Sequence, residues 1–533
     1  MTKDKEQKLM NQFWDAIAPS LSKARKRTVA LFLAVVLLWI AAPAPARAQR
    51  LPPTSTQSIQ PYVDRVIDNV TEFTLDNGMN FIVLERHAAP VVSFSIYADV
   101  GGADEAVGKT GAAHFLEHLA FKGTPRIGTR NYAEEKPLLE RLDQLFEQIQ
   151  GAKEAGQTEE VARLEAEFAE AQAQASAYVK QNEFGQIVET AGGVGLNAGT
   201  SADFTIYFYS LPANKLELWM SLESERFLEP VFREFYKEKQ VILEERRLRT
   251  DNSPIGQTIE AFLDAAYTVH PYKRPVIGYD EDIRNLTRED IRQFFETHYV
   301  PSKLTAAIVG DVDPVQVEEL ARVYFGRYPA KPEAADTIAP EPPQQGTREV
   351  TLRLESQPWY LEGYHRPSIR DRDNAVYDLI ASLLSDGRTS RLYKALVERK
   401  QVALNAQGFN GFPGDKYPNL VLFYALTAPG RSVEEVAAAL HEEIERLKTE
   451  PASEQELKRV KTKAKASLLR TLDSNSGMAR LLAEYEGKTG DWRNLFEQLD
   501  AIASVTAADI QRVARETFTP ENRTIGRILP KTQ

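Results

Sequence analysis

Short stretches with the two-residue period of strands alternate with longer stretches that have the period of helices. The first strands are predicted to form a hairpin, with Asp76, Asn77 and Gly78 in the turn between them. Predicted strands cover residues 81–84, 91–100 and 204–209, and predicted helices cover residues 112–121, 216–228 and 234–250. Because the strand signals are antiparallel, the pattern predicts an α+β fold.

A proline-rich stretch without periodicity, residues 331–348, divides the 533-residue chain. On either side of it, DIRQFFETHYVPSKLT and DIQRVARETFTPENRT match at one offset, and each follows a plausible helix N-cap, Thr287 or Thr506. A chance match over one segment is the alternative. We expect two related halves, 49–330 and 349–533, each with a mainly antiparallel sheet and packed helices, joined by a linker.

Residues 136–184 differ from the rest of the first half, with apolar residues at helical spacing and dense charge between them. The stretches LLERLDQLFEQIQ and EEVARLEAEFAEAQAQASAYV lie on either side of a turn at Gly156. This pattern predicts an inserted antiparallel helical hairpin. We interpret it as a solvated spacer without chemistry.

The first 48 residues have the order of a secretory signal peptide. A basic run ends at Arg27, fifteen apolar-rich residues follow over 28–42, and an A-x-A cleavage site ends at Ala48. Fifteen residues fall short of the roughly 20 that span a bilayer. We therefore expect export to the periplasm, and the alternative is an uncleaved segment that anchors the protein to a membrane.

Composition narrows the possible partners and metal ligands. The chain has 65 Lys and Arg against 76 Asp and Glu, and no region forms a basic stripe, so nucleic acid is not an expected partner. The chain has no cysteine, which excludes thiol nucleophiles, thiolate metal sites and disulfides. Any metal must be held by His and carboxylate side chains.

The segment HFLEH, residues 114–118, concentrates the candidate chemistry. On a helix, His114, Glu117 and His118 project from one face. Two imidazoles one turn apart form a zinc-binding pair, and a catalytic Zn²⁺ takes a third protein ligand and keeps one position open for water. Glu117 can take the proton of that water, and H-x-x-E-H is the inverzincin signature. The alternative is a surface helix that carries two His by chance.

The third ligand is expected to be a carboxylate from another helix, since Cys is absent and His is scarce. On the predicted helix 234–250, Glu238 and Glu245 lie seven residues apart, on one face and two turns from each other. Glu234 and Glu244 are further candidates. The pattern alone does not choose among these four carboxylates.

The chain resembles the pitrilysin/insulinase family of zinc metallopeptidases, particularly its mitochondrial-processing-peptidase-like bacterial branch. The segments that carry the resemblance are HFLEHLAFKGT, GGVGLNAGTSADFTIYFYSLP and KEKQVILEER. The resemblance implies a clamshell arrangement of the halves around a peptide cleft, one Zn²⁺ per chain, Glu245 as third ligand and Glu238 as a supporting acidic residue. The spacing from His118 to Glu245 exceeds the family's usual spacing, and the inserted hairpin accounts for the excess.

The segment around Asn197, Ala198, Gly199 and Thr200 resembles the family's edge strand, to which an extended peptide adds as one more strand. The implied function is an exported zinc-dependent endopeptidase that hydrolyses peptides or unfolded polypeptide segments, with Glu117 as general base. The alternative is a noncatalytic scaffold or chaperone-like subunit of a larger complex. A scaffold would hold no stoichiometric zinc. Lone histidines such as His270 are interpreted as structural.

The second half lacks two residues that the family resemblance leads us to expect there, and this difference implies a partner subunit. Active family members usually place an Arg and a Tyr there, and the resembling segment LYKALVERKQVALNAQG carries Val397 and Leu404 at these positions. Neither side chain can donate a hydrogen bond. The resemblance therefore implies a heterodimer with a homologous Arg/Tyr-bearing subunit, or otherwise a homodimer.

Overall fold

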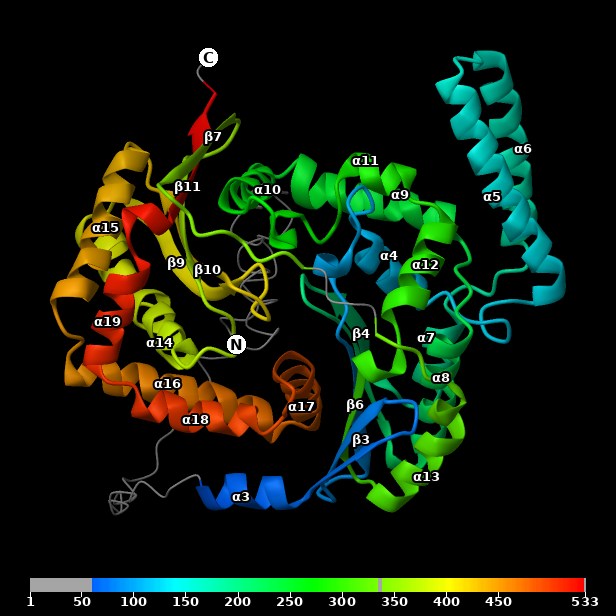
Figure 1. Ribbon diagram of the computed structural model, residues 1–533, viewed down its shortest axis with the longest axis horizontal. Coiled ribbons are helices and arrows are strands. Elements are labelled where there is room, and N and C mark those ends of the chain that lie inside the picture. Colours follow the sequence, from blue (N-terminus) through cyan, green and yellow to red (C-terminus); the bar gives the residue numbers. More distant parts are fainter. Residues whose placement is uncertain (1–59, 334–337, 532–533) are drawn as a thin grey trace, which may run out of the picture. The chain divides into compact units, whose positions relative to one another are not determined.

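Two sheets form the framework of the computed structural model, which describes residues 60–333 and 338–531 (Figure 1). The predicted signal peptide lies outside the described residues. The first sheet has the strand order β1-β2-β6-β3-β5-β4, so β4 is an edge strand. Its strands are β1 (Val70–Thr74), β2 (Asn80–Glu85), β3 (Val91–Ala98), β4 (Val194–Thr200), β5 (Thr205–Pro212) and β6 (Leu304–Gly310). Only β2 and β6 pair in parallel in this sheet.

The second sheet has the order β7-β11-β8-β10-β9, and again a single pair, β7 and β11, is parallel. Its strands are β7 (Arg348–Leu354), β8 (Trp359–Arg366), β9 (Ala403–Phe412), β10 (Asn419–Thr427) and β11 (Arg523–Pro530). The repeated sequence segments form α12 (Arg288–His298) before β6 and α19 (Ala507–Thr517) before β11. Thr287 and Thr506 cap these helices with identical capping boxes. The predicted α+β fold of two related parts is confirmed.

Helix α3 (Gln60–Asp68) precedes β1 in the chain. The remaining helices of the first part are α4 (Ala112–Leu119), α5 (Tyr132–Glu154), α6 (Thr158–Ser176), α7 (Glu183–Thr190), α8 (Leu216–Leu228), α9 (Phe235–Arg246), α10 (Pro254–Ala266), α11 (Asp280–Asn285) and α13 (Pro314–Tyr324). In the second part they are α14 (Asn374–Ser385), α15 (Val433–Thr449), α16 (Glu454–Asp473), α17 (Asn475–Thr489) and α18 (Asn494–Ser504). Across the described ranges, no helix is both long and apolar enough to span a bilayer.

Two hydrophobic clusters lie on either side of segment 331–348, and a helix from each part packs on the sheet of the other. Helix α17 lies against β3 and β6, while α10 lies against β7 and β11. Glycines permit both approaches: a Cβ at Gly487 would lie 2.1 Å from the Tyr97 ring, and one at Gly526 would lie 3.1 Å from the Phe262 ring. This exchange places Ile67–Gln533 in one compact body.

The segment between the two parts is anchored at Glu341, although no helix or strand covers its described residues before Arg348. The Glu341 carboxylate accepts hydrogen bonds from the backbone N–H groups of Thr268, Val269 and His270. It also lies 3.8 Å from the Arg348 guanidinium. The proline-rich segment is therefore fixed to the loop after α10, a contact that its composition did not predict.

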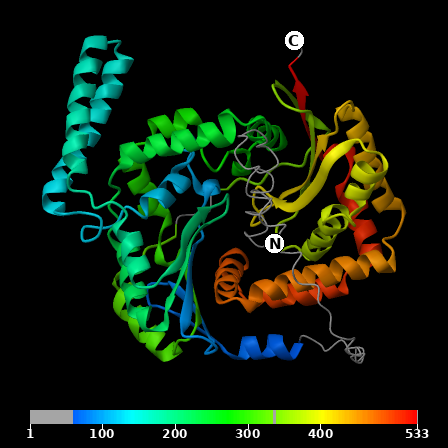
Figure 2. The ribbon, with the colours of Figure 1, turned by 180° about the vertical axis from the view of Figure 1, so that it is seen from behind.

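Helices α5 and α6 form the antiparallel pair expected from the sequence, and both views show them projecting past α9 and α12 (Figures 1 and 2). The pair is not a fully solvated spacer. Leu139, Leu142 and Leu145 of α5 are at most 5% exposed and belong to the first hydrophobic cluster. The base of the hairpin is thus part of the core, and only its outer turns are surrounded by solvent.

Candidate metal centre

Helix α4, which carries HFLEH, is fixed by its packing and by hydrogen bonds at its start. Its apolar residues face the core, and Phe115 stacks on Phe235 of α9 with ring centroids 4.5 Å apart. At the helix start, the buried Glu105 carboxylate accepts the N–H groups of Gly111 and Ala113 at 3.0 and 2.9 Å. These bonds satisfy orphan donors of the first turn. The stacking and the cap together set α4 against α9, the helix that carries the candidate third ligand.

Side chains from the two helices converge at one point. The Glu245 Oε2 atom lies 3.8 Å from His114 Nε2 and 3.6 Å from His118 Nε2. One ligand atom from each of the three residues lies within 4.8 Å of the others, and no other group of this kind occurs among the described residues. Two imidazole nitrogens and one carboxylate oxygen match the donor set of catalytic zinc sites. The three side chains therefore fit a zinc ion.

A second carboxylate orients one of the candidate ligands. Glu238 Oε1 lies 2.8 Å from His118 Nδ1, and Glu238 Oε2 lies 2.6 Å from the Lys122 ammonium. Burial alone would raise the pKa of Glu238, but the hydrogen bonds from His118 and Lys122 lower it to about 2. With its Nδ1 occupied, His118 directs Nε2 toward Glu245, as the supporting shell of a metal site requires.

The two imidazoles differ in their electrostatic surroundings. Burial, with a smaller effect of the neighbouring His118, lowers the pKa of His114 to about 3, so its ring is neutral at pH 7. Burial would also lower the pKa of His118, but the hydrogen bond and negative charge of Glu238 raise it above the usual value. A neutral imidazole is the form that binds a metal.

The candidate general base faces the edge strand. The Thr200 hydroxyl of β4 donates a hydrogen bond to Glu117 Oε2 at 2.6 Å. A pocket of about 350 Å³ opens beside it. Six residues singled out from the sequence line this pocket: Glu117, His118, Asn197, Ala198, Glu234 and Glu238. The pocket thus joins the metal centre to the edge of the first sheet.

The other two carboxylates pair with basic side chains and not with the two imidazoles. Glu244 is exposed and pairs with Arg247, while Glu234, just before α9, contacts Lys237, Gln181 and Lys122. The geometry therefore selects Glu245 and Glu238 from the four candidates. Glu245 Oε1 also pairs with Arg249, one turn further along, at 2.8 Å.

Sequence reasoning did not single out Lys122 or Arg249, and it placed Thr200 in the edge strand without linking it to Glu117. Lys122 and Thr200 lie inside the segments that carry the family resemblance, and Arg249 follows Glu245 at the i, i+4 spacing of a helical ion pair. The i, i+4 spacing of Glu245 and Arg249 could therefore have predicted this ion pair from the sequence. The contacts of Lys122 and Thr200 join residues more than 80 positions apart, which no local pattern encodes.

The isolated histidines make structural contacts. His270 is buried and its Nδ1 accepts the backbone N–H of Tyr272, and His365 Nε2 lies 3.0 Å from the Ala266 carbonyl. In the second part, Val397 packs against the hydrophobic cluster and Leu404 is 50% exposed at the start of β9. Neither side chain adds a hydrogen-bond donor to the cleft.

Comparison with known proteins finds matches over most of the chain. The family model "Insulinase (Peptidase family M16)" matches residues 81–146 and 165–280, and the model "Peptidase M16 inactive domain" matches residues 285–464. The zinc protease PqqE of Helicobacter pylori is 30% identical over 452 residues, which are 84% of this chain and 89% of that protein. The chain therefore belongs to the insulinase (M16) peptidase family.

Solved structures share the fold. The crystal structure of a protease from Helicobacter pylori has 29% identity and a TM-score of 0.73, with 86% of this chain and 99% of that chain covered. The periplasmic protease PqqL from Escherichia coli, at 17% identity and a TM-score of 0.64, shares the fold over 87% of this chain and 48% of its own.

Proposed function

We propose that the protein is an exported zinc-dependent endopeptidase that hydrolyses peptides or unfolded polypeptide segments. The observation that carries this proposal is the convergence of His114, His118 and Glu245, with Glu117 on the same helix face and an edge strand beside it. One zinc ion per chain is expected because the described residues contain one such group.

Each residue of the site has a role in this proposal. When bound by His114, His118 and Glu245, zinc would act as a Lewis acid toward the scissile carbonyl and lower the pKa of a water. The Glu117 carboxylate accepts the proton of the attacking water and delivers it to the leaving amine nitrogen. Glu238 holds the His118 ring through Nδ1.

The substrate would be bound through its backbone. β4 is an edge strand, and Asn197 and Ala198 lie in the stretch of β4 that borders the pocket. An extended peptide added to this edge would lie beside Glu117. Backbone pairing tolerates many side chains, which suits hydrolysis of unfolded segments more than recognition of one folded partner.

The decisive experiment replaces the proposed base. Glu117→Gln keeps the size of the side chain but removes its basicity, so we expect peptide hydrolysis to fall by about 10²- to 10⁴-fold while zinc stays bound. Glu244→Gln makes the same change at an exposed position of α9 and should behave as the wild type. The measurements are cleavage of a mixed peptide library and zinc content by elemental analysis.

Two results would reject the proposal. Wild-type cleavage by the Glu117→Gln variant would show that the base is wrong. Absence of stoichiometric zinc from the wild-type protein would instead favour the noncatalytic scaffold or chaperone-like subunit.

Export to the periplasm rests on the signal-like order of residues 1–48, and a structural neighbour is named a periplasmic protease. Mass spectrometry of the mature N-terminus separates a cleaved signal from a membrane anchor.

We further propose a homologous partner subunit that supplies an Arg and a Tyr to the cleft, in place of Val397 and Leu404. Two observations support it. The nearby arginines are engaged within the second part, since Arg391 pairs with Glu456 and Arg399 pairs with Glu443. The chain also covers only 48% of the Escherichia coli neighbour, whose length would hold two such units.

A further inference from the structure

A fully buried ion pair connects the base of the α5–α6 hairpin to the start of α9. Glu135, in the first turn of α5, and Arg233, just before α9, have side chains that are 0% and 1% exposed. The Arg233 guanidinium donates to both carboxylate oxygens of Glu135, at 2.9 and 3.2 Å. Such a bidentate pair fixes direction as well as distance.

The other side of the guanidinium holds the loop that follows the HFLEH helix. Arg233 donates to the backbone carbonyls of Lys122, Thr124 and Ile127. Gly123 and Gly128 have φ values of +91° and +88°, and a Cβ at either position would lie 3.0 or 2.8 Å from Arg233 Nη1. The loop therefore wraps around the guanidinium so closely that side chains are excluded at both glycines.

This loop reaches the metal centre through the side chain of Lys122. The Lys122 ammonium, whose backbone carbonyl is held by Arg233, pairs with Glu238 Oε2, and Glu238 Oε1 contacts His118 Nδ1. A continuous series of polar contacts thus runs from Glu135 through Arg233, Lys122 and Glu238 to His118.

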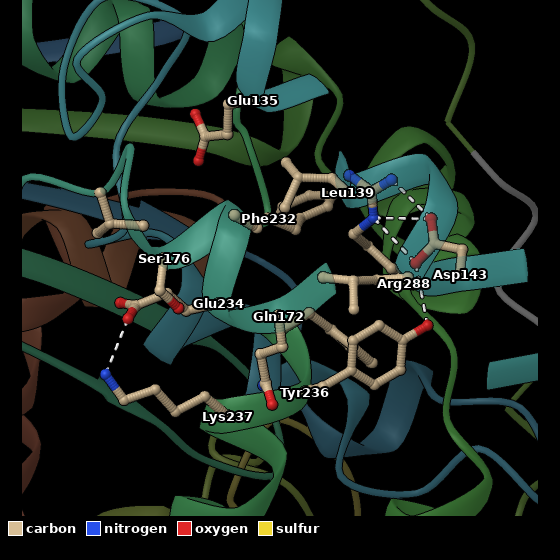
Figure 3. Close-up of a pocket in the computed structure, with 14 residues that line it drawn as sticks. Glu135, Leu139, Asp143, Gln172, Ser176, Phe232, Glu234, Tyr236, Lys237 and Arg288 are labelled. Carbon is tan, nitrogen blue, oxygen red and sulfur yellow. Dashed lines mark hydrogen bonds and ion pairs between the residues drawn. The ribbon is translucent and has the colours of Figure 1, made fainter. Parts of the chain in front are cut away.

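A second contact holds the same hairpin against α9. The Asp143 carboxylate of α5 accepts hydrogen bonds from Arg288 of α12 and from the Tyr236 hydroxyl of α9, and Figure 3 shows both side chains converging on it. Phe146 packs against Tyr236 with ring centroids 5.0 Å apart. Helix α9, which carries Glu238 and Glu245, therefore packs directly against α5.

From these contacts we infer that Glu135 is a positioning residue of the metal centre, and that the base of the α5–α6 hairpin belongs to the active-site framework. The Glu135 carboxylate orients the Arg233 guanidinium, which binds three backbone carbonyls of the loop after α4. The loop in turn positions Lys122, whose ammonium orients Glu238 against Nδ1 of His118. The inference rests on the proposed function, because it takes zinc as the ion held by His114, His118 and Glu245.

The test measures zinc retention in the full chain. Zinc-loaded protein is mixed with excess chromogenic zinc chelator, and the rate of zinc transfer is recorded. Glu135→Gln is expected to lose zinc about tenfold faster than the wild type, the lower end of the effect seen when partners of metal ligands are removed. Glu167→Gln is the matched control, because it makes the same change on the same hairpin where the arginine partners are exposed, and it should match the wild type.

A further control separates positioning from loss of stability. Leu440→Ala opens a cavity in the second hydrophobic cluster, remote from the metal centre, and should lower thermal stability without changing zinc release. If Glu135→Gln and Leu440→Ala, compared at equal loss of stability, release zinc equally fast, the inference is wrong.

The remaining outcomes are also decisive. A folded Glu135→Gln protein that retains zinc as the wild type does overturns the inference. If this variant does not fold, Glu135→Asp, which keeps the charge, is judged by the same two criteria. A wild-type chain that binds no stoichiometric zinc refutes the proposed function, whereas zinc binding that is insensitive to Glu135 refutes the positioning role alone.

Discussion

At the scale of single residues, the proposed base is oriented by one hydroxyl. The Thr200 Oγ1 atom donates to Glu117 Oε2 at 2.6 Å, and Thr205 Oγ1 lies 3.5 Å from Thr200 Oγ1. Since Thr200 is the last residue of β4, the strand expected to bind substrate also holds the carboxylate that acts on it. Substrate binding and base orientation therefore depend on one strand.

Replacement of this hydroxyl should slow catalysis without loss of metal. For Thr200→Val, which keeps the shape of the side chain, we expect kcat to fall about ten- to hundredfold, because a hydrogen bond to a charged group contributes about 1.5–3 kcal/mol. Thr200→Ser keeps the donor and should retain most activity. Steady-state kinetics and zinc content check this, and an unchanged kcat in Thr200→Val would contradict the orienting role.

At the scale of elements, helix ends are set by residues that the sequence makes recognisable. Helix α16 begins with a capping box in which Ser453 and Glu456 bond each other's backbone N–H groups. Glu456 also receives two hydrogen bonds from Arg391, which lies 65 positions earlier in the chain. The Arg391 guanidinium, aided by the cap, lowers the pKa of Glu456 to about 2.

This cap should give a defined pH dependence of stability. Because the folded-state pKa of Glu456 is depressed, its contribution is complete above about pH 4.5 and is lost as pH falls toward 2. Glu456→Gln should therefore lower the free energy of unfolding by roughly 1–2 kcal/mol at pH 7 and by less at pH 3, after allowance for solvent screening. Urea unfolding at both pH values tests this, with the exposed Glu454→Gln as control. An equal loss at both pH values would mean that the charge is not involved.

At the scale of the whole molecule, the two related parts carry different chemistry. The first part holds the metal centre, and among the described residues of the second part no comparable ligand group occurs. The positions of Val397 and Leu404 leave the second part without the donors that the family resemblance implies for the cleft. A homologous subunit can supply them because the complementary side chains need only face the cleft and need not belong to the same chain.

The proposed subunit arrangement predicts the behaviour of the isolated chain. We expect weak peptide hydrolysis from this chain alone, and a rise in turnover together with formation of a heterodimer when a homologue that bears the Arg and Tyr is added. Light scattering gives the mass and a peptide assay gives the turnover. A monomer or homodimer with full turnover that gains nothing from the homologue would contradict the partner proposal.

The sequence by itself determined the elements and the local arrangement of candidate ligands. Strand and helix periods predicted several elements of the first half, the N-caps Thr287 and Thr506 appear where their spacing placed them, and the helical period set His114, Glu117 and His118 on one face. These features depend on residues a few positions apart, so backbone geometry alone translates their spacing into structure.

Only the tertiary structure decided which α9 carboxylates face the metal centre, that Thr200 contacts Glu117, and that the hairpin base packs into the core. The Thr200 contact joins residues 83 positions apart, and that between Arg233 and Glu135 joins residues 98 apart. A charged helix has the same local periodicity whether all its carboxylates are solvated or one of them is buried. The sequence therefore could not distinguish the buried Glu135 from its exposed neighbours. The physical reason is that burial depends on what the chain places opposite a residue.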